Sequence, residues 1–200
     1  IDKNIHTALL HKQDNPLSYP IIRLNSEEKL QLSFDDFNTD LRDYHYTIIH
    51  CNSDWTSSDL MQSEYIDGFF ENKIENYEFS FNTLQKYTNY QLVFPEEYLQ
   101  PTLSGNYIIS VFVNNNPEEI VLQKRFMMLD EKISVSANVK RATIIEDRQY
   151  KQEVDFIITH GNMDIANPYS DIKVVLKQNN REDNSITNLK PLFVKQKQLI

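Results

Sequence analysis

The sequence predicts an all-β fold made of tandem immunoglobulin-like or fibronectin-like β-sandwiches, with the second sandwich incomplete. Apolar and polar residues alternate with a period of two over many short stretches. Clusters of Asn, Asp, Ser and Pro separate these stretches at regular intervals. The chain also holds 11 Phe and 11 Tyr, and aromatic side chains suit a pleated, half-buried surface. Short strands spaced this closely favour a sandwich over alternating strands and helices.

The alternating stretches define the expected strands of the first part of the chain, and one face of each is expected to be buried. The stretches are KLQLSFD, YHYTIIHC, NYEFSFN, NYQLVFP, NYIISVFV and EIVLQKRFMML. The predicted core residues are Leu30, Leu32, Phe34, Ile48, Phe79, Phe81, Leu92, Phe94, Ile109 and Val111. If the register near Ile109 is off by one residue, Ile108 and Phe112 replace Ile109 and Val111.

A charged break at 129–132 divides the chain into two expected domains. Residues 1–130 form the first sandwich, and residues 131–200 form a second sandwich that is small or cut short. Its four strand candidates are ISVSANVK, QEVDFIITH, DIKVVLKQ and PLFVKQ. The second part is shorter than the ~100 residues of a complete immunoglobulin-like sandwich, which is why we expect it to be incomplete.

Composition and charge exclude several functional classes. The formal net charge is −9, from 29 acidic and 20 basic residues, and no cluster of Lys or Arg offers a surface for nucleic acid or anionic lipid. The chain has only 3 glycines, too few and too scattered for a P-loop or a dinucleotide fingerprint. No apolar run approaches the ~20 residues of a membrane helix. Residues 1–10 also lack signal-peptide features, so either no signal peptide exists or one was removed before residue 1.

Neither a metal site nor a nucleophile is evident among the residues that could provide one. His45 and His50 lie an odd number of positions apart, so one strand points them to opposite faces and they cannot chelate a metal together. Cys51 follows His50 directly, and neighbouring strand residues point apart, so the imidazole cannot activate the thiol. Ser104 lacks the frame of a nucleophile elbow. We therefore predict no catalytic residue, no metal and no cofactor.

One acidic turn resembles the start of a calcium-binding loop. Asp36, Asn38 and Asp40 fall at the first, third and fifth positions of such a loop. Leu41 stands where the loop needs Gly, and Thr47 stands where it needs a bidentate Glu. We interpret this segment as a solvated turn.

The longest irregular connection, from Asn52 to Asn76, is the candidate functional region. It holds the only Trp of the chain, together with a Tyr and two Phe, in a segment where apolar residues are costly unless they are packed or bound. One hypothesis buries these side chains against the sandwich, and the other exposes some of them as anchors for a partner. The candidate partner-binding residues are Trp55, Tyr65, Phe69 and Phe70.

A series of sequence strings resembles a known family. In order, these strings are NPLSYPIIRLNS, LSFDD, YTIIHCNSDWTSSDL, EYIDGFFEN, YEFSFNTL, PTLSGNYIISVF and VKRATIIEDRQYKQEVDF. Together they resemble the N-terminal region of the plug proteins of the type IX secretion system, over about residues 15–156. Each string alone is unspecific, whereas their ordered combination is specific.

This resemblance implies a non-enzymatic periplasmic protein of Gram-negative bacteria. Family members close the periplasmic opening of a very large outer-membrane β-barrel translocon while it carries no cargo. The resemblance implies no catalytic residues, no cofactor, no small-molecule substrate and no direct insertion into lipid. Family members are longer than this chain, which implies that residue 200 is not a natural end.

A different class of function is also compatible with a sandwich of this kind. The chain could be a carbohydrate-binding module whose aromatic platform includes Trp55 and Tyr65, or an accessory domain of a surface enzyme. Exposure distinguishes these hypotheses. A sugar platform needs coplanar exposed rings over a groove, whereas a plug needs a broader and flatter contact surface.

Overall fold

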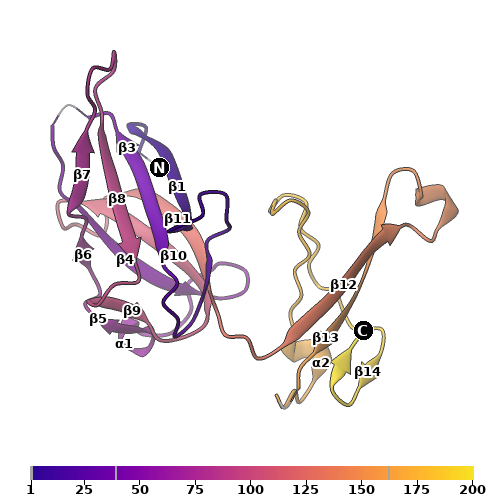
Figure 1. The fold of residues 1–200 in the computed structure, drawn as a ribbon. Helices are drawn as coiled ribbons and strands as arrows, with labels where there is room; N and C mark the ends of the chain where they lie inside the picture. Colours follow the sequence, from indigo (N-terminus) through magenta and orange to yellow (C-terminus); the bar gives the residue numbers. More distant parts are fainter. Residues whose placement is uncertain (1, 39, 162) are drawn as a thin grey trace. The chain divides into compact units, whose positions relative to one another are not determined.

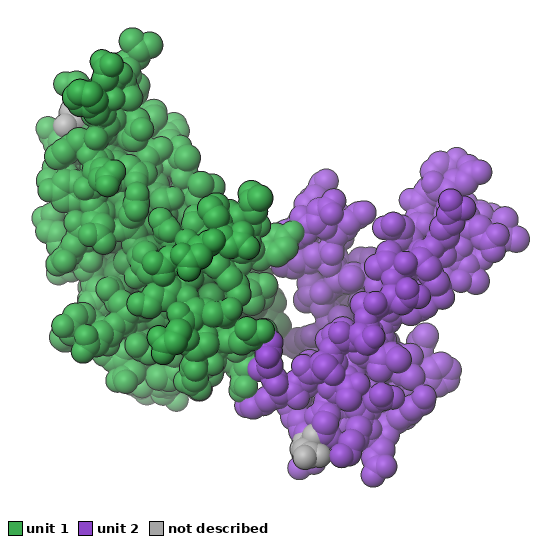
Figure 2. All heavy atoms as spheres, in the orientation of Figure 1, with its two compact units in different colours: residues 1–130 green, residues 131–200 purple. Residues whose placement is uncertain are grey.

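The computed structural model describes residues 2–38, 40–161 and 163–200, and the fold it shows is almost entirely β (Figure 1). The helical elements of these residues are two short helices and one 3-10 turn. The chain divides into two compact units, residues 1–130 and residues 131–200, shown in different colours in Figure 2. The all-β prediction is therefore confirmed.

Unit 1 contains two larger sheets and one small one. The first sheet has the order β1 (Ile5–Lys12), β3 (Leu30–Asp36), β8 (Thr88–Phe94) and β7 (Asn76–Phe79), all antiparallel. The second has the order β2 (Ile21–Arg23), β11 (Ile120–Leu129), β10 (Gly105–Val113), β4 (Tyr44–Cys51) and β6 (Asn72–Lys73), with only β2 and β11 parallel. A small third sheet pairs β5 (Ile66–Gly68) with β9 (Leu99–Pro101).

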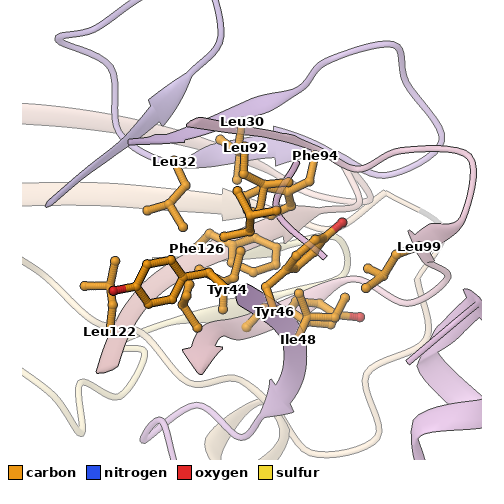
Figure 3. Close-up of a cluster of buried hydrophobic side chains, with 14 of the residues drawn as sticks. Leu30, Leu32, Tyr44, Tyr46, Ile48, Leu92, Phe94, Leu99, Leu122 and Phe126 are labelled. Atoms are coloured by element: carbon orange, nitrogen blue, oxygen red, sulfur yellow. The ribbon is translucent and has the colours of Figure 1, made fainter. Parts of the chain in front are cut away.

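Aromatic rings join the two larger sheets in the core of unit 1 (Figure 3). Tyr44 of β4 meets Phe34 of β3 and Tyr90 of β8 edge to face, with ring centroids 5.2 and 4.7 Å apart. Phe94 of β8 meets Phe126 of β11 in the same way at 5.2 Å. Pairs of this kind contribute about 0.5–1.5 kcal/mol beyond the area they bury. The contacts run between sheets, so they hold the sandwich together.

The acidic segment at the end of β3 is exposed at Asp40 and Leu41, as expected of a solvated turn, but its first residue, Asp36, is buried. The Asp36 carboxylate accepts a hydrogen bond from the Tyr44 hydroxyl at 2.8 Å and one from Asn38 N at 2.9 Å. Burial, followed by the contact with Asp36, raises the pKa of Tyr44 well above its ordinary value. Asp36 therefore satisfies the hydrogen-bonding requirement of a core hydroxyl.

Two further core tyrosines find partners outside the strands. The Tyr90 hydroxyl donates to the carbonyl oxygen of Arg42 at 2.9 Å. The Tyr46 hydroxyl donates to Glu96 Oε1, and burial together with this carboxylate raises the pKa of Tyr46. A buried hydroxyl without a partner costs roughly 1–3 kcal/mol, so these bonds place the connecting segments as well as the strands.

Eight of the ten predicted core side chains are buried, and the prediction was wrong for Phe79 and Phe81. The eight are Leu30, Leu32, Phe34, Ile48, Leu92, Phe94, Ile109 and Val111. Phe112, on the opposite face of β10 from Ile109 and Val111, is buried too, and its ring stacks on that of His45 of β4 at a centroid distance of 6.0 Å.

Phe79 and Phe81 are 66% and 94% exposed although the predicted alternation is correct. Tyr77 of the same strand pairs with the buried Tyr90, so the odd-numbered positions of β7 lie on the core side of their sheet. The opposite sheet ends at this side in the two-residue strand β6, and the outer part of β7 has no cover. Alternation thus identified the face but not whether another layer packs on it.

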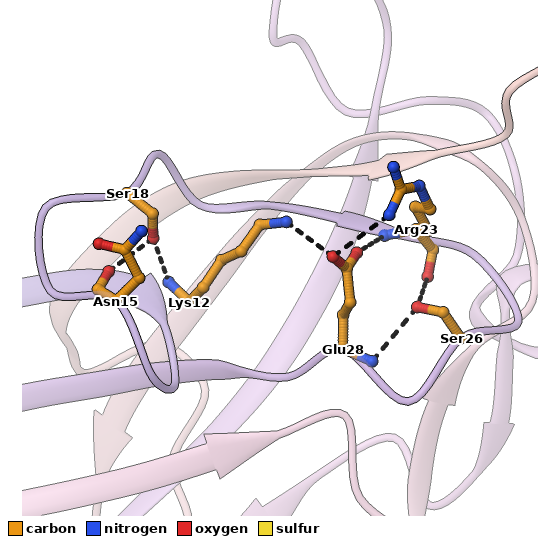
Figure 4. Close-up of polar contacts among 6 residues, drawn as sticks. All are labelled: Lys12, Asn15, Ser18, Arg23, Ser26 and Glu28. Atoms are coloured by element: carbon orange, nitrogen blue, oxygen red, sulfur yellow. Dashed lines mark hydrogen bonds and ion pairs between the residues drawn. The ribbon is translucent and has the colours of Figure 1, made fainter.

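Glu28 joins the β1 and β2 ends of unit 1 through a polar network (Figure 4). Its carboxylate lies 2.8 Å from Lys12 Nζ and accepts a hydrogen bond from Arg23 N at 2.8 Å. Ser26 Oγ donates to the carbonyl oxygen of Arg23 at 2.7 Å and closes the turn that carries Glu28. The hydrogen bond from Lys12, and then that from Arg23 N, lower the pKa of Glu28.

Unit 2 contains one four-stranded antiparallel sheet among its described residues. Its order is β12 (Ser134–Arg141), β13 (Gln152–Thr159), β15 (Gln198–Leu199) and β14 (Val194–Lys195). The unit also contains η1 (Ile145–Asp147) and α2 (Pro168–Asp171). The first two strand predictions are confirmed by β12 and β13.

The third strand prediction in unit 2, DIKVVLKQ, was wrong, and the fourth shrinks to the two residues of β14. Asn167 caps α2 by accepting a hydrogen bond from Tyr169 N at 3.0 Å, and Pro168 takes the first helical position. The predicted strand begins inside this helical turn, and the isolated bridge Leu176–Ile186 is the pairing described for it. The apolar and polar residues of DIKVVLKQ alternate as in a strand, but the segment has no long partner strand and so forms no continuous hydrogen-bonded ladder.

Replacing Phe94 should destabilise unit 1, whereas replacing Phe79 should not. Phe94→Ala removes a fully buried ring and should lower the free energy of unfolding by about 3–5 kcal/mol. Phe79→Ala should change it by less than about 0.5 kcal/mol because the ring is already in water. Chemical denaturation of both variants measures this difference. Equal losses would show that β7 is covered in solution.

Replacing Glu28 should produce a pH-dependent loss of stability. The pKa of Glu28 is lowered in the folded state, so its stabilisation is complete above its ordinary value of 4.5 and is lost as pH falls through the folded pKa. Glu28→Gln should cost less than about 1 kcal/mol at pH 7, and the difference from the wild type should shrink below pH ~4.5. Glu27→Gln, at the exposed neighbouring position, is the matched control. A loss that is the same at pH 3 and pH 7 would contradict this account.

Candidate partner-binding surface

The connection from Asn52 to Asn76 is an ordered part of unit 1. It contains α1 (Gln62–Tyr65), β5 and β6. Gln62 Nε2 donates to Thr47 Oγ1 on β4 at 3.2 Å, and Ile74 N donates to the carbonyl oxygen of Tyr44 at 2.8 Å. Ile66 and Ile74 belong to the core cluster. The connection is therefore held at several points along its length.

Tyr65 is a core residue and not an exposed contact. Its side chain is only 4% exposed and packs beside the rings of His50 and Tyr107, at centroid distances of 5.7 and 6.1 Å. Tyr107 in turn donates from its hydroxyl to the carbonyl oxygen of Leu103 at 2.8 Å. Burial raises the pKa of Tyr65. Its role is to attach α1 to the sandwich, so the hypothesis of burial is correct for this residue.

Trp55 lies at the tip of a tight turn after β4, with one face covered. Its backbone adopts a left-handed conformation with a φ of 69°. Asn52 supports the turn by donating from its backbone N–H to the carbonyl oxygen of Thr56 at 2.8 Å. The Arg125 guanidinium carbon lies 4.6 Å from the centroid of the Trp55 ring, a cation–π arrangement. Trp55 is half-buried, so it is neither fully packed against the sandwich nor fully exposed as a partner anchor.

Phe69 and Phe70 are exposed, and the structure brings Tyr98 beside Phe69. Phe69, Tyr98 and Phe70 are 63%, 57% and 41% exposed. The rings of Phe69 and Tyr98 have centroids 6.2 Å apart and planes tilted by 33°. We call these three residues the Phe69 patch. They form an aromatic surface that water covers in the isolated chain.

Gly68 allows Phe69 to approach Tyr98 so closely. Its φ is +104°, a conformation that residues with a side chain rarely adopt. A Cβ atom at this position would lie 2.3 Å from the carbonyl oxygen of Tyr98. Phe69 N donates to that same oxygen at 2.7 Å. The patch therefore rests on backbone contacts as well as on side chains.

The Phe69 patch presents two phenylalanine rings and one tyrosine ring at the surface of unit 1. Among the described residues, no group of three or more His, Cys, Asp and Glu side chains is arranged to hold a metal ion. The Cys51 thiol is buried against the carbonyl oxygen of Ile49 at 3.6 Å, and burial raises its pKa. Within the described parts of the chain, no helix has the length and hydropathy needed to cross a membrane.

The sugar platform expected from Trp55 and Tyr65 is not formed. Tyr65 is buried, and Arg125 covers one face of Trp55. The tilt between Phe69 and Tyr98 does not supply a coplanar pair of rings in its place.

The chain is similar to solved structures. A protein of Parabacteroides merdae, described as hypothetical, superimposes with a TM-score of 0.93 at 33% sequence identity, over 99% of this chain and 50% of that one. This chain therefore spans half the length of that protein. A Pseudomonas fluorescens alkylpurine DNA glycosylase also matches, with 12% identity and a TM-score of 0.33 over 62% of this chain and 30% of its own.

The family comparison agrees with the resemblance noted in the sequence strings. No curated protein matches the chain. The model for the first domain of the type 9 secretion system plug protein matches residues 5–130, which covers well over half of the sequence and nearly all of unit 1. The chain therefore belongs to the type 9 secretion system plug protein family, and residues 5–130 are its first domain.

Proposed function

We propose that this protein is a non-enzymatic periplasmic plug that closes the periplasmic opening of the idle type IX outer-membrane translocon. The observation that carries the proposal is the match of residues 5–130 to the plug family. The partner is a large β-barrel, and the contact includes the Phe69 patch. No nucleic acid, lipid insertion or small-molecule substrate takes part.

The anchoring of the Phe69 patch supports its role as a contact. Phe69 N donates to the carbonyl oxygen of Tyr98, and the buried residues Ile66 and Ile74 flank the two phenylalanines along the chain. Aromatic side chains that are ordered before binding lose little conformational entropy when a partner covers them. Exposed aromatic residues of this kind also dominate the binding energy of many protein interfaces. Trp55 stays a candidate for an additional contact through the open part of its ring.

The remainder of the chain supplies bulk and solubility in this proposal. A plug has to be folded and wider than the opening that it covers, and two β units in tandem, each folding as a domain, would supply such a body. A formal net charge of −9 keeps the unbound protein soluble and disfavours self-association.

Replacing the two exposed phenylalanines should weaken translocon binding without loss of stability. The double variant Phe69→Ala/Phe70→Ala should lose about 2 kcal/mol or more of binding free energy, roughly 30-fold in Kd, when measured on the detergent-solubilised outer-membrane translocon. The melting temperature should hardly change, because both rings are exposed.

Leu17→Ala is the matched control, since Leu17 is an exposed apolar side chain in the connection between β1 and β2, a different segment from those of the Phe69 patch. It should change neither binding nor melting. Unchanged translocon affinity of the double variant would refute the role of the Phe69 patch. Failure of the wild-type protein to recover a large β-barrel from solubilised outer membranes would refute the plug function itself.

A further inference from the structure

Strand β7 is an open edge of its sheet. It pairs with β8 through Asn76–Gln91, Tyr77–Tyr90, Glu78–Asn89 and Phe79–Thr88. Among the described residues no strand pairs with its other side, and Figure 1 shows it at the margin of unit 1. An open edge is a row of donors and acceptors that another extended chain can use.

The backbone groups available on this edge belong to Tyr77 and Phe79. Ser80 N donates to the carbonyl oxygen of Tyr87 at 2.9 Å, so Ser80 and Tyr87 form a hydrogen-bonded pair that prolongs the ladder. Such pairs alternate along an antiparallel ladder, so Glu78 also bonds towards β8. The N–H and C=O groups of Tyr77 and Phe79 consequently point away from β8.

The two residues whose backbone groups point away from β8, Tyr77 and Phe79, also carry the aromatic side chains of β7. The Tyr77 and Phe79 rings contact each other edge to face at a centroid distance of 5.5 Å, on the core side of the sheet. Phe81 follows at the next alternate position and is almost fully exposed. A chain that pairs with this edge would place its alternate side chains directly beside these rings.

The opposite face of the edge carries the Glu78 carboxylate. Glu78 is exposed, and its row continues through Asn89 of β8 to Asp35 of β3. Asn89 Nδ2 donates to Asp35 Oδ1 at 2.8 Å. Glu75 is exposed just before the strand and has the Lys73 ammonium as a charged neighbour. A basic residue beside Glu78 would therefore meet a complementary charge at cross-strand distance.

The other edge of the same sheet is protected in a way that β7 is not. The pairing of β1 with β3 shifts between His6 and Leu9, and Thr7 within this bulge has a φ of 50°. Bulges of this kind prevent edge-to-edge pairing. The ladder of β7 has no register shift and no proline. The two edges of one sheet thus differ in their ability to accept a strand.

We propose that β7 accepts an extended segment of a protein partner in which apolar and basic residues alternate, as an added strand of the sheet. Its apolar side chains would cover Tyr77 and Phe79 on one face, and a Lys or Arg would lie beside Glu78 on the other. A second copy of this chain is a poorer occupant, because it would bring together two edges with Glu75 and Glu78 and two net charges of −9. This site lies on a different element from the Phe69 patch and does not depend on the plug function.

A peptide-binding experiment tests the proposal on the intact 200-residue protein. The probes are fluorescein-labelled, amidated decapeptides of three sequences: alternating Val and Lys, alternating Val and Glu, and a control with five Val followed by five Lys. Fluorescence anisotropy should show that the alternating Val–Lys peptide binds at least tenfold more tightly than this non-alternating control. Binding should also slow hydrogen exchange at the Tyr77 and Phe79 amides.

Substitutions at exposed positions separate the backbone, ring and charge contributions. Phe79→Ala should weaken binding by removing the ring, and Phe79→Pro should weaken it about fivefold further by removing an N–H that faces the peptide. Glu78→Lys should reverse the preference, so that the Val–Glu peptide binds better than the Val–Lys peptide. This variant retains the edge and tests the proposal even if the proline variant unfolds.

Two results would overturn the proposal. Equal affinity for the alternating Val–Lys peptide and the non-alternating control would show that only the overall charge of the peptides attracts them. Unchanged exchange at the Tyr77 and Phe79 amides in a saturated complex would show that the peptide binds elsewhere.

Discussion

The buried tyrosines between the two larger sheets of unit 1 need hydrogen-bond acceptors for their hydroxyl groups, and this need fixes the segments that supply the acceptors. Each buried tyrosine brings a hydroxyl into a region without water, and each of these hydroxyls has to find an acceptor. The acceptors lie near or beyond the ends of the strands: Asp36, Arg42, Glu96 and Leu103. The residues that hold the sheets together therefore also position the connecting segments, including those that end in the candidate contact surface.

The strand pattern contained most of the information about the core and less about what covers it. Alternation identified Leu30, Phe94 and their neighbours because two layers pack over those positions. The same alternation at Phe79 marked the correct face of β7, but the opposite sheet does not extend over it. Whether a second layer exists is a tertiary property, and no local pattern reports it. The missed strand after Asp171 has a related cause, because a strand requires a partner as well as a pattern.

The candidate surface was predictable in part. The position of Phe69 in a long connection was evident from the sequence, whereas the contact with Tyr98 depends on the pairing of β5 with β9, which brings together residues far apart in the chain. Gly68 was the available signal, since a rare glycine before two aromatic residues indicates a close backbone approach. The burial of Tyr65 could not be predicted in this way, because it depends on the position of Tyr107 on another strand.

The core of unit 1 holds the connection from 52 to 76 in place while the rings of Phe69 and Phe70 stay exposed. Native-state hydrogen exchange of the amides of Phe69, Ile74 and Thr102 tests it most directly, because each donates to a backbone oxygen of another segment. We expect opening free energies within about 1–2 kcal/mol of those of the strands β4 and β10. Exchange of these amides as fast as that of the exposed Leu84 would instead show that the connection is a mobile loop.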